Sequence, residues 1–167
     1  MKWYRTAANQ GFSEAQYSLG VIYTNGEGVP EDYAEAVKWY RLAAKQGEVK
    51  AQHNLALMYH NGFGVPQDDL WAHMWLTIAS GQGNKSSDEV RGIIAESMTS
   101  ADISEAQKMA RECLNSKYQN CGFLSFKTHR NRNNPCQATN IKKPRSFIRN
   151  SVLKAASTSL KTPLAYE

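Results

Sequence analysis

The most constraining feature of this sequence is a segment that returns every 36 residues. Three tryptophans, Trp3, Trp39 and Trp75, keep this step, since 39 − 3 = 36 and 75 − 39 = 36. Two further sets of residues keep it as well: Ala15, Leu19, Tyr23, Gly26, Gly28 and Ala36 return as Ala51, Leu55, Tyr59, Gly62, Gly64 and Ala72. A period between about 20 and 50 residues is typical of solenoid proteins, in which one small unit recurs because it cannot bury its apolar face alone. The repeat therefore favours binding over catalysis as the function.

Each repeat has the pattern of two helices joined by a tight loop. Leu19 and Tyr23 belong to an apolar stripe at helical spacing, which predicts a first helix over about residues 13–24. The glycines that follow end this helix, because glycine tolerates the left-handed conformation found at helix ends. Asp32 is then a good N-cap for a second helix that runs to about residue 46. The sequence thus predicts an all-α fold of stacked helix pairs.

Three stretches of one repeat form a pattern that can be compared with known repeats: Leu19-Gly20-Val21-Ile22-Tyr23, Gly26-Glu27-Gly28-Val29 and Asp32-Tyr33-Ala34-Glu35-Ala36-Val37-Lys38-Trp39. They resemble the Sel-one-like repeat, a subclass of the tetratricopeptide superfamily. The resemblance covers residues 1 to about 83 and implies a right-handed α-solenoid of antiparallel helix pairs. It also implies that the protein is an adaptor or scaffold that binds another protein or a peptide.

The repeat divides the chain into five segments. They are 1–11, the second helix of a truncated repeat; 12–47 and 48–83, two repeats; 84–122, a degenerate repeat or capping helix pair; and 123–167, a tail. A cap is expected because repeat arrays must keep their last apolar face out of water. The first helix that would pair with residues 1–11 is missing. Either the chain is a fragment, or the uncapped N-terminal helix meets another chain, for example by self-association.

Charge separates the tail from the repeats. Residues 1–122 hold 11 Lys and Arg against 14 Asp and Glu, a net −3, whereas residues 123–167 hold 9 against 1, a net +8. The tail has many Asn and Ser and no sustained periodicity, so we expect it to be largely disordered. Clustered Lys and Arg attract nucleic acid or anionic lipid through counterion release, without reading a sequence. Such binding is one alternative function, although no motif for a specific nucleic acid accompanies the tail.

Signals for catalysis and for metal binding are weak. His53 and His60 share a helix face, but two turns separate them by about 11 Å, too far to hold one metal ion without a third element. Ser151 and Lys154 match the Ser-x-x-Lys pattern of penicillin-recognising enzymes but lack its companion motifs. Some cysteine-rich relatives of the repeat family have been linked with β-lactams, so a β-lactam- or peptidoglycan-related enzyme is the other alternative function. We expect no catalytic residue, cofactor or metal.

The cysteines leave two interpretations open. Cys113 and Cys121 form a disulfide if the chain turns back after Lys117; otherwise Cys113 is a small core residue and Cys121 a free thiol. Cys136 lies in the tail. No segment has the length of a membrane span or the pattern of a signal peptide. Because related repeat proteins are often exported, a periplasmic or secreted location is favoured over a cytoplasmic one if the natural chain begins earlier.

The binding surface is expected where the copies differ while their packing positions hold. In arrays of the kind that the resemblance implies, the first helices line the concave face. Their varying positions are Glu14, Tyr17, Ser18 and Thr24 in one copy and Lys50, His53, Asn54 and His60 in the next. We expect these side chains to hold a peptide or protein segment by polar contacts, with aromatic support from Tyr17.

The residues that recur at the 36-residue step are expected to form the structural core, Trp3 included. Trp39 and Tyr23 should be buried between helices, and Trp75 should behave similarly. Trp71 has no aromatic counterpart one period back, where Glu35 stands. Its ring is therefore expected either to be exposed or to seal the boundary with the capping helices.

Overall fold

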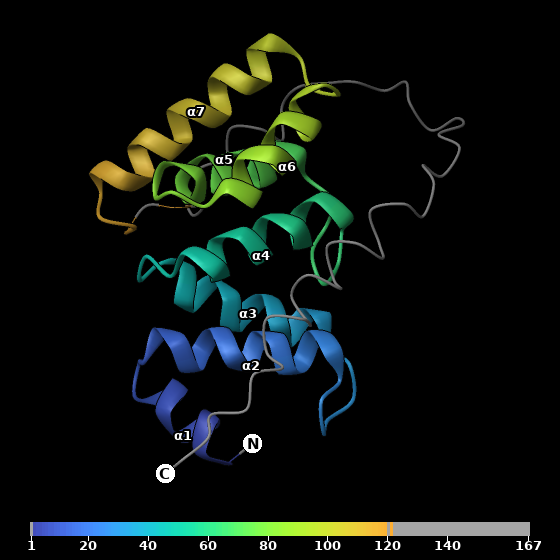
Figure 1. Ribbon diagram of the computed structural model, residues 1–167, viewed down its shortest axis with the longest axis vertical. Coiled ribbons are helices and arrows are strands. Elements are labelled where there is room, and N and C mark those ends of the chain that lie inside the picture. Colours follow the sequence, from blue (N-terminus) through green and yellow to red (C-terminus); the bar gives the residue numbers. More distant parts are fainter. Residues whose placement is uncertain (1, 120, 122–167) are drawn as a thin grey trace. The chain divides into compact units, whose positions relative to one another are not determined.

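The computed structural model describes residues 2–119 and 121, which form helices and no strands. The helices are α1 (Lys2–Asn9), α2 (Ser13–Asn25), α3 (Tyr33–Ala44), α4 (Val49–Asn61), α5 (Asp69–Gly81), α6 (Lys85–Ala95) and α7 (Ser100–Asn115). They follow one another through the stack in chain order (Figure 1). The predicted all-α, right-handed solenoid of antiparallel helix pairs is confirmed. The expectation that the tail, 123–167, is disordered falls on residues outside those described.

Matching caps set the helix boundaries in the two full repeats. Gly26 ends α2 and Gly62 ends α4, with φ of 68° and 69°, a left-handed conformation that favours glycine. Asp32 and Asp68 then begin α3 and α5, because their carboxylates accept hydrogen bonds from backbone N–H groups of the first turn. The second helix of a repeat therefore starts where the sequence places its N-cap.

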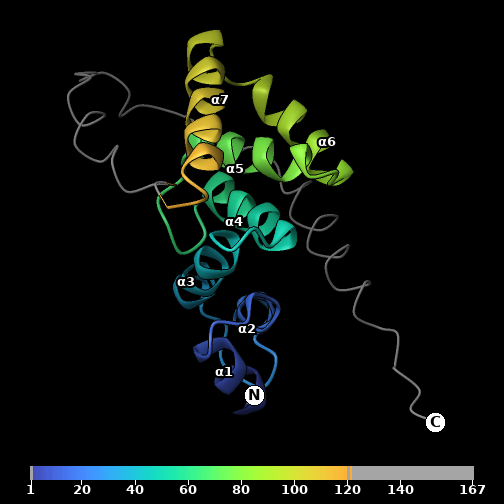
Figure 2. The same ribbon diagram turned by 90° about the vertical axis from the view of Figure 1, so that its left-hand side faces the viewer.

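The helices pack as neighbours along the stack. α2 pairs with α3 and α4 pairs with α5, while α1 packs on α2 and α3 packs on α4. The C-terminal end differs, because α6 and α7 both pack against α5 and have little contact with each other. Figure 2 shows α6 and α7 diverging from their shared neighbour. The two helices expected over 84–122 exist, but each contributes to the core through α5 rather than by pairing with the other.

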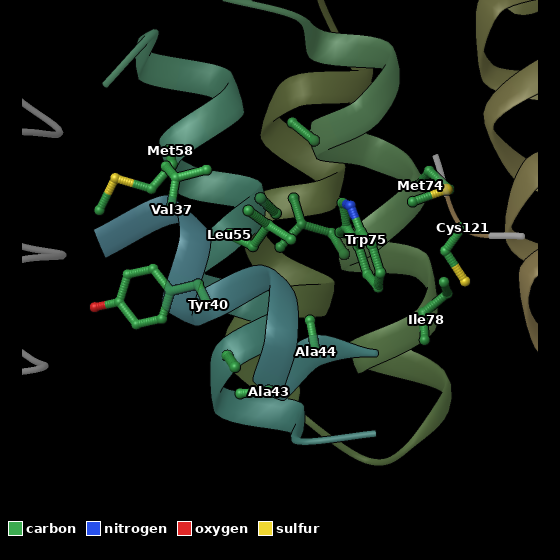
Figure 3. Close-up of a cluster of buried hydrophobic side chains, with 14 of the residues drawn as sticks. Val37, Tyr40, Ala43, Ala44, Leu55, Met58, Met74, Trp75, Ile78 and Cys121 are labelled. Atoms are coloured by element: carbon green, nitrogen blue, oxygen red, sulfur yellow. The ribbon is translucent and has the colours of Figure 1, made fainter. Parts of the chain in front are cut away.

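Alanines and a few large side chains fill the interior. Ala36, Ala51 and Ala72 are fully buried, and their methyl groups allow the helix axes to approach closely. Leu55 and Trp75 belong to the main cluster, which also includes residues of α6 and α7 (Figure 3). A smaller cluster of Ala8, Ala15 and Leu19, with Ala7, Ile22 and Trp39 packed against it, joins α1 to the first full repeat.

The three repeated tryptophans differ widely in burial. Trp75 is 3% exposed and Trp39 is half-buried, whereas Trp3 is 89% exposed. The prediction that Trp3 belongs to the core is therefore wrong, and Trp39 is less buried than predicted. Trp39 packs against the cluster that contains Ala15 and Leu19 of α2, and among the described residues no helix takes the equivalent place beside α1. A recurring residue is buried only where its packing partner recurs with it.

Two other aromatic residues depart from expectation. Tyr23 is half-buried rather than fully buried, because its ring packs inside while its hydroxyl reaches Arg5 at the surface. Trp71 is also half-buried and not exposed, and it packs against the main cluster. Its ring stacks on Tyr59 of α4, with the centroids 6.1 Å apart.

A disulfide joins Cys113 in α7 to Cys121, which decides between the two interpretations of these cysteines. Both residues are buried, at 1% and 4% exposure. Lys117 and Tyr118 have φ of 50° and 65°, so the chain reverses direction just after α7 and returns to the core. Tyr118 packs against the main cluster and lies close to Gly47, in the loop between α3 and α4.

Candidate binding surface

The predicted contact positions lie on α2 and α4, but they are not equally accessible. Glu14 and Lys50 are exposed, and Thr24 is buried at 6% exposure. The other five are half-buried, namely Tyr17, Ser18, His53, Asn54 and His60. Only Glu14 and Lys50 are therefore fully accessible to a partner, and the other six residues are at least partly buried.

Thr24 serves the core rather than the surface, so its assignment to the binding face is wrong. Its Oγ1 donates to the Gly20 carbonyl oxygen at 2.8 Å and lies 3.2 Å from the Tyr40 hydroxyl. Asn54 Nδ2 donates to the same hydroxyl at 3.2 Å. Tyr40 is 1% exposed, and burial strongly raises the pKa of its phenol. A buried hydroxyl needs hydrogen-bond partners, and Thr24 and Asn54 supply them.

Tyr17 lies at the edge of this buried network. Its ring centroid is 6.1 Å from that of Tyr40, at an interplanar angle of 38°. Burial raises the pKa of Tyr17, and the nearby negative charge of Glu48 raises it further, against the opposing effect of a hydrogen bond with Asn54. Tyr17 therefore presents a neutral phenol at neutral pH, half packed against the interior and half available.

His53 attaches α4 to α6. Its Nδ1 is 2.8 Å from the hydroxyl oxygen of Ser87, which is fully buried. Burial lowers the pKa of His53, so the imidazole is neutral at neutral pH. Because Ser87 has no access to solvent, this pair is a structural link and not an exposed nucleophile.

His60 links the end of α4 to the start of α5. Its Nδ1 is 2.6 Å from Asp69 Oδ1, and the two side chains are 21% and 30% exposed. The three polar residues His53, Asn54 and His60 thus each have a partner within the fold. The exposed charged positions that remain are Glu14 on α2 and Lys50 on α4. Tyr17 and Ser18 lie on α2 with Glu14.

A polar link that recurs with the repeat was not predicted from the sequence. Gln46 Nε2 donates to Gln16 Oε1, and Gln82 Nε2 donates to Gln52 Oε1, both at 2.7 Å. Gln16 and Gln52 in turn donate to backbone carbonyl oxygens eight residues earlier in the chain. The recurrence of these glutamines at the 36-residue step was the available signal, since the buried amides of Gln16 and Gln52 need hydrogen-bond partners.

A second recurring link joins an arginine to a tyrosine 18 residues later. Arg5 bonds the Tyr23 hydroxyl, and Arg41 donates to the Tyr59 hydroxyl at 2.8 Å. The Arg41 guanidinium also lies over the Tyr59 ring, 5.6 Å from its centroid. Both links tie a second helix to the first helix that follows it, so they bind consecutive repeats together.

Neither a candidate metal site nor a helix able to span a membrane is found in the part of the chain that the structure describes. Among these residues no group of three or more His, Cys, Asp or Glu side chains could hold a metal ion. No helix among them is long and apolar enough to cross a bilayer. Ser151, Lys154 and Cys136 lie outside the described residues.

Comparison with known proteins identifies the repeat. The family model described as Sel1 repeat matches residues 1–12, 13–48 and 49–84, which is half of the 167 residues. This chain belongs to the Sel1 repeat family. The matched segments differ by one residue from the boundaries predicted from the sequence. Sel1 repeats typically mediate protein–protein interactions, and Sel1 repeat proteins are generally non-enzymatic scaffolds.

Solved structures show the same architecture. The chain is similar to c5321, a protective antigen of uropathogenic Escherichia coli that displays an SLR fold, with a TM-score of 0.67 and 27% identity. The match covers 84% of this chain but only 30% of that protein. A Sel1 repeat protein from Oxalobacter formigenes gives a TM-score of 0.53 and 36% identity, over 55% of this chain and 68% of that one. No curated protein matches the sequence.

Proposed function

We propose that this protein is a scaffold that binds a peptide or protein segment along the concave face lined by α2 and α4. The contact residues are Glu14, Tyr17, Ser18 and Lys50, which together we call the α2–α4 surface. Membership of a family of protein-interaction repeats supports this proposal. The expected partner is a polypeptide.

The observation that carries the proposal is a reversal of charge between equivalent positions of two successive repeats. Glu14 becomes Lys50 at the 36-residue step, and both are exposed. The residues that follow them, Ala15 and Ala51, are both buried. Packing therefore gives no reason for the change of charge. A surface that presents an acid in one repeat and a base in the next suits a partner with complementary charges in the opposite order.

His53, Asn54 and His60 have a supporting role in this proposal. Each lies on α4 and is partly exposed, while a hydrogen bond or ion pair fixes its position. Fixed side chains lose less conformational entropy when a ligand binds, so they favour recognition by a preformed surface.

The test is site-specific crosslinking followed by a charge exchange. A photoreactive amino acid at Ser18 or at Lys50 should crosslink the same polypeptide in the native host. The control is the same probe at Lys38, whose side chain on α3 is 68% exposed. The crosslinked segment is then synthesised, and its affinity is measured by calorimetry for the wild type and for a Glu14→Lys, Lys50→Glu double variant. The proposal predicts at least a tenfold loss; equal affinities would refute it.

We further propose that the protein functions in an oxidising compartment, the periplasm or the exterior of the cell. The buried disulfide between Cys113 and Cys121 supports this location, because disulfides persist in such compartments and are rare in the cytosol. Protein isolated from its native cells under acid quench should resist alkylation at both cysteines until it is reduced. Free thiols at both positions would contradict the proposal.

A further inference from the structure

A chemically reactive pair of residues recurs at the 36-residue step, as Asn25-Gly26 and Asn61-Gly62, and the sequence contains no other Asn-Gly pair. The pair is reactive because glycine has no side chain to hinder attack by its own backbone nitrogen on the preceding side-chain amide. Each asparagine is exposed at the last position of a helix, and each glycine is the left-handed cap that follows. The chain therefore presents the same reactive pair twice, in the same local conformation.

The backbone protects the two pairs in the same way. The N–H of Gly26 donates to the Ile22 carbonyl oxygen, and the N–H of Gly62 donates to the Met58 carbonyl oxygen. The glycine nitrogen must lose this proton before it can attack, so the cap has to open locally before either pair reacts. A difference in reactivity between the two pairs must therefore come from their side chains and from the residues that follow.

The two side-chain amides are held on opposite sides of their own residue along the chain. Asn25 Nδ2 donates to Glu27 Oε1 at 2.8 Å, two residues later and beyond the cap. Asn61 Nδ2 donates to the Leu57 carbonyl oxygen at 2.8 Å, four residues earlier in the helix. The amide of Asn25 is thus kept on the side of the glycine nitrogen that would attack it, whereas the amide of Asn61 is kept away from it.

The residue that follows each glycine adds to this difference. Phe63 stacks on Tyr33 of α3, with the ring centroids 4.9 Å apart. Glu27 stands at the equivalent position in the other copy and has no ring to stack. Opening the cap at Gly62 therefore disturbs an aromatic contact with a neighbouring helix as well as the bond between Asn61 and Leu57.

We propose that Asn25 is a site of spontaneous deamidation in the folded protein and that Asn61 is its protected counterpart. The backbone nitrogen of Gly26 attacks Cγ of Asn25, a C–N bond forms, and the side-chain nitrogen leaves as ammonia. Water then opens the resulting five-membered succinimide at either carbonyl group and gives aspartate or isoaspartate at position 25. The reaction needs only water, and it does not depend on the α2–α4 surface.

The modification changes the end of α2 in two ways. The new carboxylate lies at the C-terminus of a helix, where negative charge is unfavourable, and it meets the carboxylate of Glu27 in place of a hydrogen-bond donor. Isoaspartate also adds one methylene group to the backbone between α2 and its cap. Both products weaken the turn that joins α2 to α3, so the first full repeat loses stability as the protein ages.

The test is to incubate the full-length protein in mildly alkaline buffer and to follow deamidation at Asn25 and Asn61 by peptide mass spectrometry. A parallel sample in guanidinium chloride is the control, because the unfolded chain has neither caps nor side-chain hydrogen bonds. A Glu27→Ala variant is incubated in the same way. It removes the acceptor that holds the Asn25 amide beyond the cap.

In the folded protein, Asn25 should react about three- to tenfold faster than Asn61, the factor expected from one additional hydrogen bond. In guanidinium chloride the two rates should be nearly equal. Glu27→Ala should lower the folded-state rate at Asn25 towards that at Asn61. Equal rates in the folded protein, the same ratio after denaturation, or an unchanged rate in Glu27→Ala would each overturn the proposal.

Discussion

The contribution of each recurring tryptophan to stability depends on how deeply its side chain is buried. Trp75→Ala should cost about 3–5 kcal/mol of unfolding free energy, because it removes a buried indole and leaves a cavity in the main cluster. Trp3→Ala, at the equivalent but exposed position, should change stability by less than about 0.5 kcal/mol. Urea denaturation of both variants gives the comparison. Similar losses for the two would mean that Trp3 is buried in solution.

Two loop glycines offer a second matched pair. Gly28 and Gly64 are equivalent, with φ of 73° and 70°, so alanine at either position adopts an unfavourable left-handed conformation that costs about 1–2 kcal/mol. Nothing lies near an added Cβ at Gly28, whereas at Gly64 it would overlap the backbone carbonyl of Tyr33. Gly64→Ala should therefore lose clearly more stability than Gly28→Ala in urea denaturation. An equal loss would show that the loop of the second repeat relaxes freely.

The roles of residues that act locally were predictable from the sequence, whereas the roles of residues whose partners lie far along the chain were not. Gly26 and Asp32 end and begin helices through their own backbone and side chain, so their roles could be read directly. Thr24 was assigned to the surface because it differs between the two copies, and its buried partner, the hydroxyl of Tyr40, lies 16 positions away. Identity at the repeat step marked Trp3 as core without showing whether its covering helix was present.

Among the elements, α6 has an attachment that depends on protonation. His53 of α4 bonds Ser87 of α6, and His73 of α5 lies near Arg91 of α6, whose guanidinium bonds Asp88. Burial lowers the pKa of His53. Burial and then the charge of Arg91 lower the pKa of His73. Both imidazoles are therefore neutral at neutral pH in the folded protein.

The folded state should lose stability as the pH falls below about 6.5, the ordinary pKa of histidine. A lowered folded-state pKa means that the unfolded chain binds protons first, so acid favours unfolding. Urea midpoints at pH 7.5 and pH 5 should show this decrease. A His53→Gln variant should show a smaller one, since glutamine still bonds Ser87 but does not titrate. A variant with the full pH dependence would assign the effect to other groups.

The packing of elements was predictable only in part. The helix pair expected over 84–122 is present as α6 and α7. Their common attachment to α5 could not be predicted from the sequence. α5 has more buried side chains than any other described helix and packs against α4, α6 and α7, and a helical pattern does not show which partners a helix will have. The same limit applied to Trp71, whose partner Tyr59 belongs to another helix.

For the molecule as a whole, contacts between neighbouring helices mean that stability is local to each part of the array. The disulfide closes a short loop at the α7 end, and closing a loop of this size contributes about 2–3 kcal/mol in the chain-entropy model. α7 packs on α5, and α2 packs chiefly on α1 and α3. Loss of the disulfide should therefore loosen one end and leave the other end intact.

This expectation can be measured by hydrogen exchange on the full-length protein before and after reduction, with a Cys113→Ser, Cys121→Ser variant as a check on the reductant. Amide exchange should accelerate in α7 and around Tyr118, whose packing near Gly47 depends on the returning chain. Exchange in α2 should not change, because its contacts lie at the other end of the described stack. Uniform acceleration through all helices would show instead that the array unfolds as a single cooperative unit, with the disulfide stabilising every repeat equally.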